Sequence, residues 1–276
     1  MSFNILKQKS SFSGSYFILG SSSKSRLHLL NKIGYKPDLI LSPNIDESIL
    51  KQEKPRLLSQ RLSWQKSLEC YNTLIRSQNI IDVNKYKNIV ILSADTVCSL
   101  GSRVIDKALN DNDVANSLRK LSGRNHVVYT SITILEMKVQ DFINNIQEYQ
   151  MSNNISLDGN KNQLTFFSNA MFNLDFLNYK HYDKKNLVNI KKYMPSFAKI
   201  SYLTTQTRIK FKQLNDIEVL HFVESKEGLF NAGGYAIAGI AESFVVNLVG
   251  SYSSVMGLPT YQTERLLQKS NVLKIK

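Results

Sequence analysis

The sequence predicts an α/β domain that is interrupted by one insertion. Short apolar runs of strand length alternate along the chain with segments whose leucines recur at helical spacing. This alternation fails over about residues 137–200 and then returns. With 276 residues, of which 42% are hydrophobic, the chain can bury a substantial core, so a wholly disordered protein is excluded.

The N-terminal half begins with a strand, a polar loop and a helix. Residues 16–20 form a short apolar run, three serines follow, and leucines at helical spacing then extend to Ile33 before Gly34 ends the helix. The next elements expected are a strand at 36–41, a polar turn at 43–48, a helix over 56–76 and a buried strand at 88–93.

Turn and capping residues define the elements that follow. Gly101 and Ser102 predict a hairpin turn, and Asn110 or Asp111 can cap a helix that Gly123 ends. A strand is expected from His126 to Leu135. Beyond the insertion we expect a strand at 204–211, a helix with the capping-box pair Asn215 and Glu218, a glycine-rich stretch at 232–239, a strand at 244–249 and a last helix.

The insertion at about 137–200 is rich in Asn, Lys, Tyr and Phe and shows no steady period. We therefore expect residues 1–15 to be a tail and residues 16–276 to be a single domain that the insertion interrupts. Basic and aromatic residues within it would suit RNA binding, but a solvated or disordered insert is the simpler interpretation. Those residues are Lys180, Tyr182, Lys184, Lys185, Lys191, Lys192 and Tyr193.

Charge and cysteine content suggest an anionic ligand and a reducing compartment. The formal net charge is +13, although the lysines are scattered and a bias toward A/T-rich codons explains the excess equally well. Only two cysteines occur, no apolar run approaches the roughly 18 residues of a membrane span, and no secretory signal is recognisable. We therefore expect a cytoplasmic protein that does not enter a membrane.

The loop after the first strand is a candidate phosphate site. Ser21 and Ser23 would let backbone N–H groups face an anion at a helix N-terminus, and Arg26 could point back as a bidentate clamp. The alternative is a serine-capped helix with a solvated arginine.

Two acidic and two basic residues complete the candidate site. Carboxylates such as Glu47, in a turn, and Asp95, at or just beyond the end of a buried strand and followed by Thr96, can hold Mg²⁺ or Mn²⁺ or act as a general base. Lys66 or Lys107 could neutralise phosphate, but a lysine of this kind, taken alone, is more often a solvated surface residue. Histidine spacing typical of metal sites, a Walker-A loop and a GxGxxG fingerprint are absent from the sequence.

Several of these segments, taken in order, resemble one family. The chain carries FILGSSSKSR, NIDES, ILSADTV, IDKALNDNDVANSLRKLSGRNHVVYTSITI, TTQTRIKF, AGGYAIAG and GSYSSVMGLP. This ordered set resembles the Maf proteins, nucleotide pyrophosphatases of the septum-formation type. The resemblance covers about residues 16–135 and 201–268. It implies a mixed, twisted sheet with flanking helices and a central cleft.

The resemblance also implies an activity. It would be the divalent-metal-dependent hydrolysis of a nucleoside triphosphate to the monophosphate and pyrophosphate, with Asp95 as the proton acceptor and Glu47 helping Asp95 to bind Mg²⁺ or Mn²⁺. The triphosphate would be held by Ser21, Ser23, Arg26, Lys66 and Lys107. Thr96 would lie beside the general base, Asp95. Nucleoside triphosphates are the expected partners, a homodimer is compatible with the family, and nucleic acid and membrane are not expected.

The chain departs from the family pattern at the position expected to read the base. Family members that act on dTTP and UTP carry Gln where this chain has Ala238, so the preferred base is open. The loop also has Lys24 and Ser25 where the family often has Pro and Arg. A rival hypothesis is a catalytically weak nucleotide-binding regulator of cell division that keeps the pocket without turnover.

Overall fold

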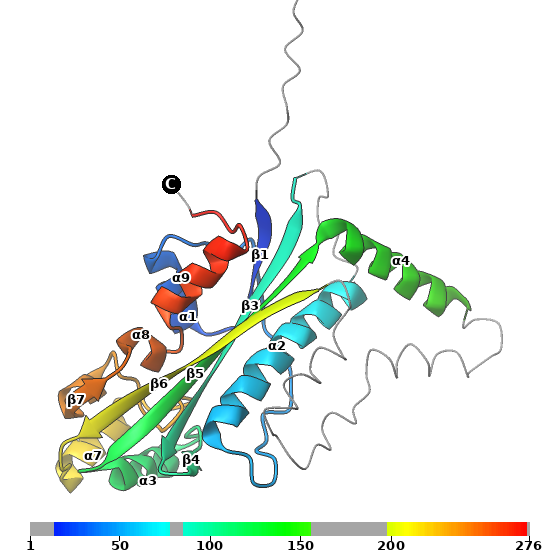
Figure 1. The fold of residues 1–276 in the computed structure, drawn as a ribbon. Helices are drawn as coiled ribbons and strands as arrows, with labels where there is room; N and C mark the ends of the chain where they lie inside the picture. The colour runs from blue at the N-terminus through cyan, green and yellow to red at the C-terminus, as the bar shows by residue number, and fades with distance from the viewer. Residues whose placement is uncertain (1–13, 78–84, 156–197, 275–276) are drawn as a thin grey trace, which may run out of the picture.

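The computed structural model describes residues 14–77, 85–155 and 198–274. Its centre is a seven-stranded mixed sheet in the order β2-β1-β3-β5-β6-β7, with β4 paired to β3 (Figure 1). The strands are β1 (Ser15–Gly20), β2 (Leu39–Leu41), β3 (Asn88–Leu100), β4 (Arg103–Ile105), β5 (Asn125–Lys138), β6 (Lys199–Phe211) and β7 (Val245–Val249). The predicted α/β class and mixed sheet are confirmed.

The sheet has a parallel part and an antiparallel part. Strand β1 runs parallel to both β2 and β3, whereas β3, β5, β6 and β7 pair antiparallel in succession. The pairing of β1 with β3 stops at Gly20 and Ser93, but β3 continues for six more residues against β5, and β4 pairs with it from Cys98 onward. Residues 94–97 of β3 therefore have no paired strand on the side of β1.

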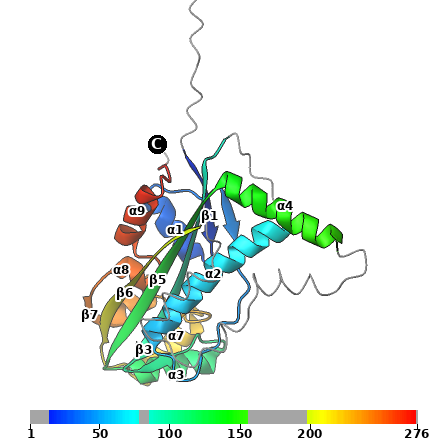
Figure 2. The same cartoon turned by 45° about the vertical axis from the view of Figure 1, so that its right-hand side comes forward.

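Helices cover both faces of the sheet (Figures 1 and 2). Helices α2 (Pro55–Ser77) and α4 (Val139–Ile155) lie on one face, and α1 (Lys24–Lys32) and α9 (Thr260–Lys269) lie on the other. The remaining elements are α3 (Asp111–Leu121), α7 (Asp216–Glu224), a 3₁₀ turn (Ile240–Phe244) and α8 (Tyr252–Val255). Helices α3 and α7 pack together at the end of the long strands. A separate hydrophobic core surrounds Phe211 and Phe222 there.

Strand alternation assigns each side chain of β3 to one face. Ile89 and Ile91 pack with Tyr71 of α2, whereas Val90 and Leu92 pack with Leu30 of α1. Continued along the strand, the same alternation places Asp95 on the α2 face and Thr96 on the α1 face.

Three predictions at element boundaries were wrong. Asp95 does not follow the end of a strand but lies within β3, because β5 supplies pairing partners beyond the point where β1 stops. Residues 139–155, which showed no clear period, form α4, and Val139 and Phe142 are buried against the α2 face. Ser15, which was assigned to the tail, already belongs to β1.

The remaining predicted elements agree with the structure within a few residues. The capping residues are confirmed, since Asn110 caps α3 and Asn215 forms a capping box with Glu218. The basic and aromatic residues that would suit RNA binding, between Lys180 and Tyr193, lie outside the described residues. Among the helices that the structure describes, none combines the length and apolar character that crossing a membrane requires.

Candidate active site

A cavity of about 430 Å³ opens where β1 stops pairing with β3. The loop after β1, the middle of β3, and the segments 230–238 and 255–257 line it. All the residues proposed from the sequence line this one cavity, namely Ser21, Ser23, Arg26, Glu47, Lys66, Asp95, Thr96, Lys107 and Ala238. Its volume lies within the range of small-molecule sites.

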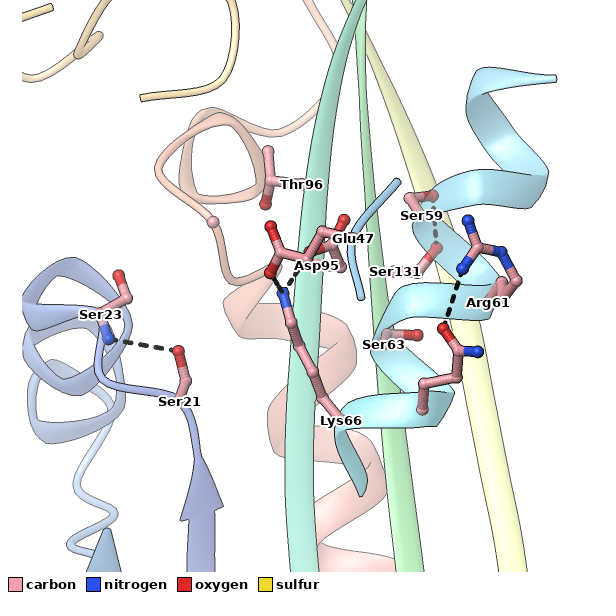
Figure 3. Close-up of polar contacts among 12 residues, drawn as sticks. Ser21, Ser23, Glu47, Ser59, Arg61, Ser63, Lys66, Asp95, Thr96 and Ser131 are labelled. Atoms are coloured by element: carbon pink, nitrogen blue, oxygen red, sulfur yellow. Dashed lines mark hydrogen bonds and ion pairs between the residues drawn. The ribbon is translucent and has the colours of Figure 1, made fainter. Parts of the chain in front are cut away.

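Lys66 joins the two candidate acids (Figure 3). Its Nζ lies 2.6 Å from Asp95 Oδ1 and 2.7 Å from Glu47 Oε1, and Lys107 pairs with the other oxygen of Glu47. The side chains of Asp95 and Lys66 are only 5% and 8% exposed, whereas Glu47 and Lys107 are more than one-third exposed. Asp95 therefore sits at the buried end of a chain of alternating charges.

Helix α2 presents Lys66 to the site because its inner face is polar. Ser59 bonds Ser131 at 2.8 Å (Figure 3), and Ser63 bonds Thr133 at 2.9 Å. Positions 59, 63 and 66 share one helical face, so these hydroxyl bonds to β5 aim Lys66 at the neighbouring strand β3. The simpler interpretation of Lys66 as a surface lysine is wrong.

A buried ion pair holds the segment that carries Glu47. Arg61 of α2 bonds both oxygens of Glu53 at 2.8 Å, and the two side chains are 1% and 2% exposed. Arg61 also donates to the Ser48 carbonyl, and Glu53 accepts from the backbone N–H of Leu50. The backbone next to Glu47 is thus tied to the same helix as Lys66.

Arg26 crosses from α1 to three other parts of the site. Its Nε donates to the Gly257 carbonyl at 2.9 Å, and its two terminal nitrogens reach the hydroxyls of Ser21 and Thr96. Gly257 has φ +110°, and a Cβ there would lie 3.4 Å from Arg26 Nε, so this close approach favours glycine. Ser23 caps α1 and donates its backbone N–H to Ser21.

Burial and charge act together on the ionisable groups. Burial would raise the pKa of Glu47, but Lys66 and Lys107 outweigh it and lower that pKa to about 2. Burial lowers the pKa of Arg26 from its usual value, and Asp95 and Glu47 oppose the shift. Glu47 is consequently an anion at neutral pH.

The carboxylates suit a hard divalent cation. Within the described ranges, no group of three or more His, Cys, Asp or Glu side chains gathers into a metal-binding set. Glu47 and Asp95 nevertheless converge on one ammonium, and Mg²⁺ is commonly held by one or two carboxylates together with substrate phosphates. The residues therefore fit a cation whose remaining ligands come from a bound phosphate and water.

Sequence reasoning missed the supporting residues of the site. Arg61 and Glu53 belong to none of the quoted motifs, and Gly257 lies in one but was given no role; only the structure shows that the pair holds the backbone beside Glu47 and that Gly257 orients Arg26. Lys66 did carry a signal, since Leu58, Leu62 and Lys66 are spaced by four residues and so continue one buried stripe.

The sequence is similar to that of one protein family over most of its length. The sequence model of the family described as Maf-like protein matches residues 16–158 and 190–270. The chain is similar to the dTTP/UTP pyrophosphatase of Mesorhizobium japonicum, with 32% identity over 250 residues that cover 91% of this chain and 89% of that protein. It is also 30% identical to the nucleoside triphosphate pyrophosphatase of Neorickettsia sennetsu over 258 residues, which cover 94% of this chain and 90% of that protein.

A third relative is the nucleoside triphosphate pyrophosphatase of Orientia tsutsugamushi, 32% identical over 250 residues that cover 91% of this chain and 90% of that protein. The family model covers most of the chain, and these relatives align along about nine-tenths of both sequences. The chain therefore belongs to the Maf-like protein family.

Proposed function

We propose that this protein is a nucleoside triphosphate pyrophosphatase that releases the nucleoside monophosphate and pyrophosphate. The observation that carries the proposal is one cavity in which Arg26, Lys66 and Lys107 surround the carboxylates of Asp95 and Glu47. A triphosphate needs several cations, and hydrolysis needs a group that accepts a proton from water. The names of the relatives, which are pyrophosphatases of nucleoside triphosphates, support the same reaction.

In the proposed reaction, Asp95 accepts the proton of a water molecule as that water attacks the α-phosphorus. A bond forms between the water oxygen and the α-phosphorus, and the bond from that phosphorus to its bridging oxygen breaks. Pyrophosphate leaves with the electron pair. The Lys66 ammonium bonds Asp95 Oδ1, so the other oxygen of the carboxylate is the one that takes the proton.

The cationic side chains hold the substrate for this step. Arg26 presents a planar guanidinium that Ser21 and Gly257 already orient, which lowers the entropic cost of clamping a phosphate. Lys107, which is 44% exposed, can turn from Glu47 toward an incoming anion. These contacts would stabilise the charge that moves onto the leaving pyrophosphate.

We further propose that Glu47 and Asp95 bind Mg²⁺ or Mn²⁺ together with the triphosphate. The cation would neutralise phosphate charge and polarise the phosphoryl oxygens. A cytoplasmic location and a homodimer also remain predictions.

Pyrophosphate release measured across a panel of nucleoside triphosphates, with and without Mg²⁺ or Mn²⁺, tests the function. Asp95→Asn should keep the fold but lower kcat by about 10²–10⁴-fold, because an amide of similar volume cannot accept the proton. Asp216→Asn is the matched control, since that side chain is 91% exposed and lies outside the cavity.

Near wild-type turnover by Asp95→Asn would show that Asp95 is not the base. Nucleotide binding without pyrophosphate release in the wild-type protein would favour the regulator instead. Activity that is unchanged by removal of divalent cations would contradict the proposed metal dependence.

A further inference from the structure

Phe230 combines two features that are unfavourable for an aromatic side chain. It is 69% exposed, and its backbone has φ +61°, in the left-handed region that favours glycine or asparagine. It also lines the cavity that holds Asp95 and Lys107. A strained backbone that holds an exposed ring at the mouth of a ligand cavity is characteristic of a functional position.

The surrounding backbone fixes Phe230 in this conformation. Its N–H donates to the Ala108 carbonyl at 2.8 Å, and β-bridges join Ala108 to Leu229 and Lys107 to Ala232. The residue is therefore attached on both sides to the segment that carries Lys107. The backbone that carries the ring therefore needs little ordering when a ligand binds.

The loop that continues from Phe230 is also fixed from within. The Glu227 carboxylate accepts the N–H of Ile240 at 2.8 Å, and the Asn231 amide donates to the carbonyls of Glu227 and Leu229. Since the Asn231 NH₂ group is bonded to its own loop, it is not free to read the edge of a base.

This part of the cavity is mostly apolar. Besides Phe230, its apolar side chains are those of Val128, Ala232, Ala236, Ile237 and Ala238, whereas Asn231 and Tyr235 are polar and the Tyr235 hydroxyl is bonded to His126. Most of the charged side chains come from other segments, on α1, α2, β3 and around Glu47, and Lys107 is bridged to this loop at Ala232. A ligand that has a polyanionic end and a flat aromatic end would match these two parts of the lining.

We propose that Phe230 stacks on the nucleobase of the substrate, so that this loop recognises the face of the base and not its hydrogen-bonding edge. The inference rests on the proposed function, since it takes the ligand to be a nucleoside triphosphate. Stacking accepts every base because each has a π-face. Phe230 would thus contribute affinity for the nucleobase, to which Ala238 offers only a methyl group.

The test separates the contribution of the nucleobase to binding from that of the phosphates. Phe230→Ala should weaken binding of α,β-methylene analogues of UTP and GTP by about tenfold or more, a change typical of lost stacking. The inhibition constant of inorganic tripolyphosphate, which carries the charge but no base, should stay the same. Phe230→Trp should bind both nucleotides at least as tightly as the wild type. Tyr261→Ala, which removes an aromatic ring that is 65% exposed outside the cavity, should change neither constant.

Phe230→Gly distinguishes a binding role from a structural one. Glycine tolerates positive φ, so this variant should be at least as resistant to urea as Phe230→Ala, while binding nucleotide equally weakly. Unchanged nucleotide affinity in Phe230→Ala, or an equal loss for tripolyphosphate, would overturn the proposal. These are binding measurements, so a protein that binds nucleotide but does not hydrolyse it would refute the proposed function without deciding the role of Phe230.

Discussion

Ala238 is exposed at the cavity and offers no donor or acceptor to a base. A site discriminates strongly between bases only when a polar partner reads the edge. We therefore expect the wild-type enzyme to favour dTTP and UTP over other nucleotides by less than about tenfold in kcat/KM. Ala238→Gln should sharpen that preference, as measured by kcat/KM for dTTP, UTP and GTP. A wild-type enzyme that is already strict for dTTP and UTP would show that another residue sets selectivity.

His126 makes stability depend on pH. It is 1% exposed, its Nε2 lies 2.8 Å from Tyr235 Oη, and burial lowers its pKa from 6.5 to about 4. Between these values the unfolded chain binds a proton that the folded chain does not, so stability falls as the pH falls from 6.5 toward 4. The expected loss from this group between pH 7.5 and pH 5 is about 2 kcal/mol.

Urea unfolding of the wild type and of His126→Gln at these two pH values measures that loss. The variant will be less stable at pH 7.5, but its stability should fall by about 2 kcal/mol less on acidification. Glu47 changes this comparison little, since its pKa falls from 4.5 to about 2 on folding and its contribution to stability is lost only as the pH falls from about 4.5 toward 2. An equal decrease in both proteins would show that His126 does not titrate as proposed.

At the scale of elements, the Arg61–Glu53 pair joins α2 to the segment around Glu47. Arg61→Met would leave a buried carboxylate without its partner, which costs about 3–5 kcal/mol in the free energy of unfolding. Adding Glu53→Gln removes that charge and should restore part of the loss. Urea denaturation of the single and double variants measures both effects.

Arg76→Met is the matched control on the same helix. Its partner is Glu69, and the pair is 42% and 22% exposed, so the loss should stay below about 1 kcal/mol. A double variant no more stable than Arg61→Met alone would show that the unpaired charge is not the cause.

The order of elements could be predicted from the sequence because each has a local signal, such as the capping residues Asn110 and Asn215. The length of β3 could not be predicted, since the six residues that follow Ser93 pair with β5, about 35 positions further along the chain. Helix α4 was missed because its hydrophobic periodicity is weak and the packing of Val139 and Phe142 decides its position. The positions of Arg26 and Lys66 in the site followed from the family resemblance, whereas Phe230 and Arg61 emerged only from tertiary contacts.

At the scale of the whole molecule, part of the insertion should be dispensable. The removable part is shorter than the segment at about 137–200 that the composition marks as an insertion. The register of β5 and β6 begins at Glu136 and Lys199, and α4 supplies buried side chains between them. The family model leaves residues 159–189 unmatched. Replacing 160–188 by a short Gly/Ser linker should therefore leave kcat/KM and urea stability close to wild type, because changing the length of a surface loop costs little entropy.

Replacing 140–198 should instead destabilise the fold, since it removes Phe142 from its contact with Tyr71. Parallel urea denaturation and pyrophosphate assays on the two deletions check this contrast. If the shorter deletion folded normally but lost activity, part of the insertion would belong to the active site.

The hydrogen bond from Arg26 to Gly257 spans 231 positions and has a consequence for synthesis on the ribosome. Nascent chains acquire structure from the N-terminus onward, so α1 and its arginine exist long before the residue that orients the guanidinium has been translated. Growing chains of this protein thus pass through most of elongation without the finished contacts of the proposed phosphate clamp. If Arg26 has that role, a transcript cut short before codon 257 would encode a product that lacks this geometry entirely, not one with proportionally reduced turnover.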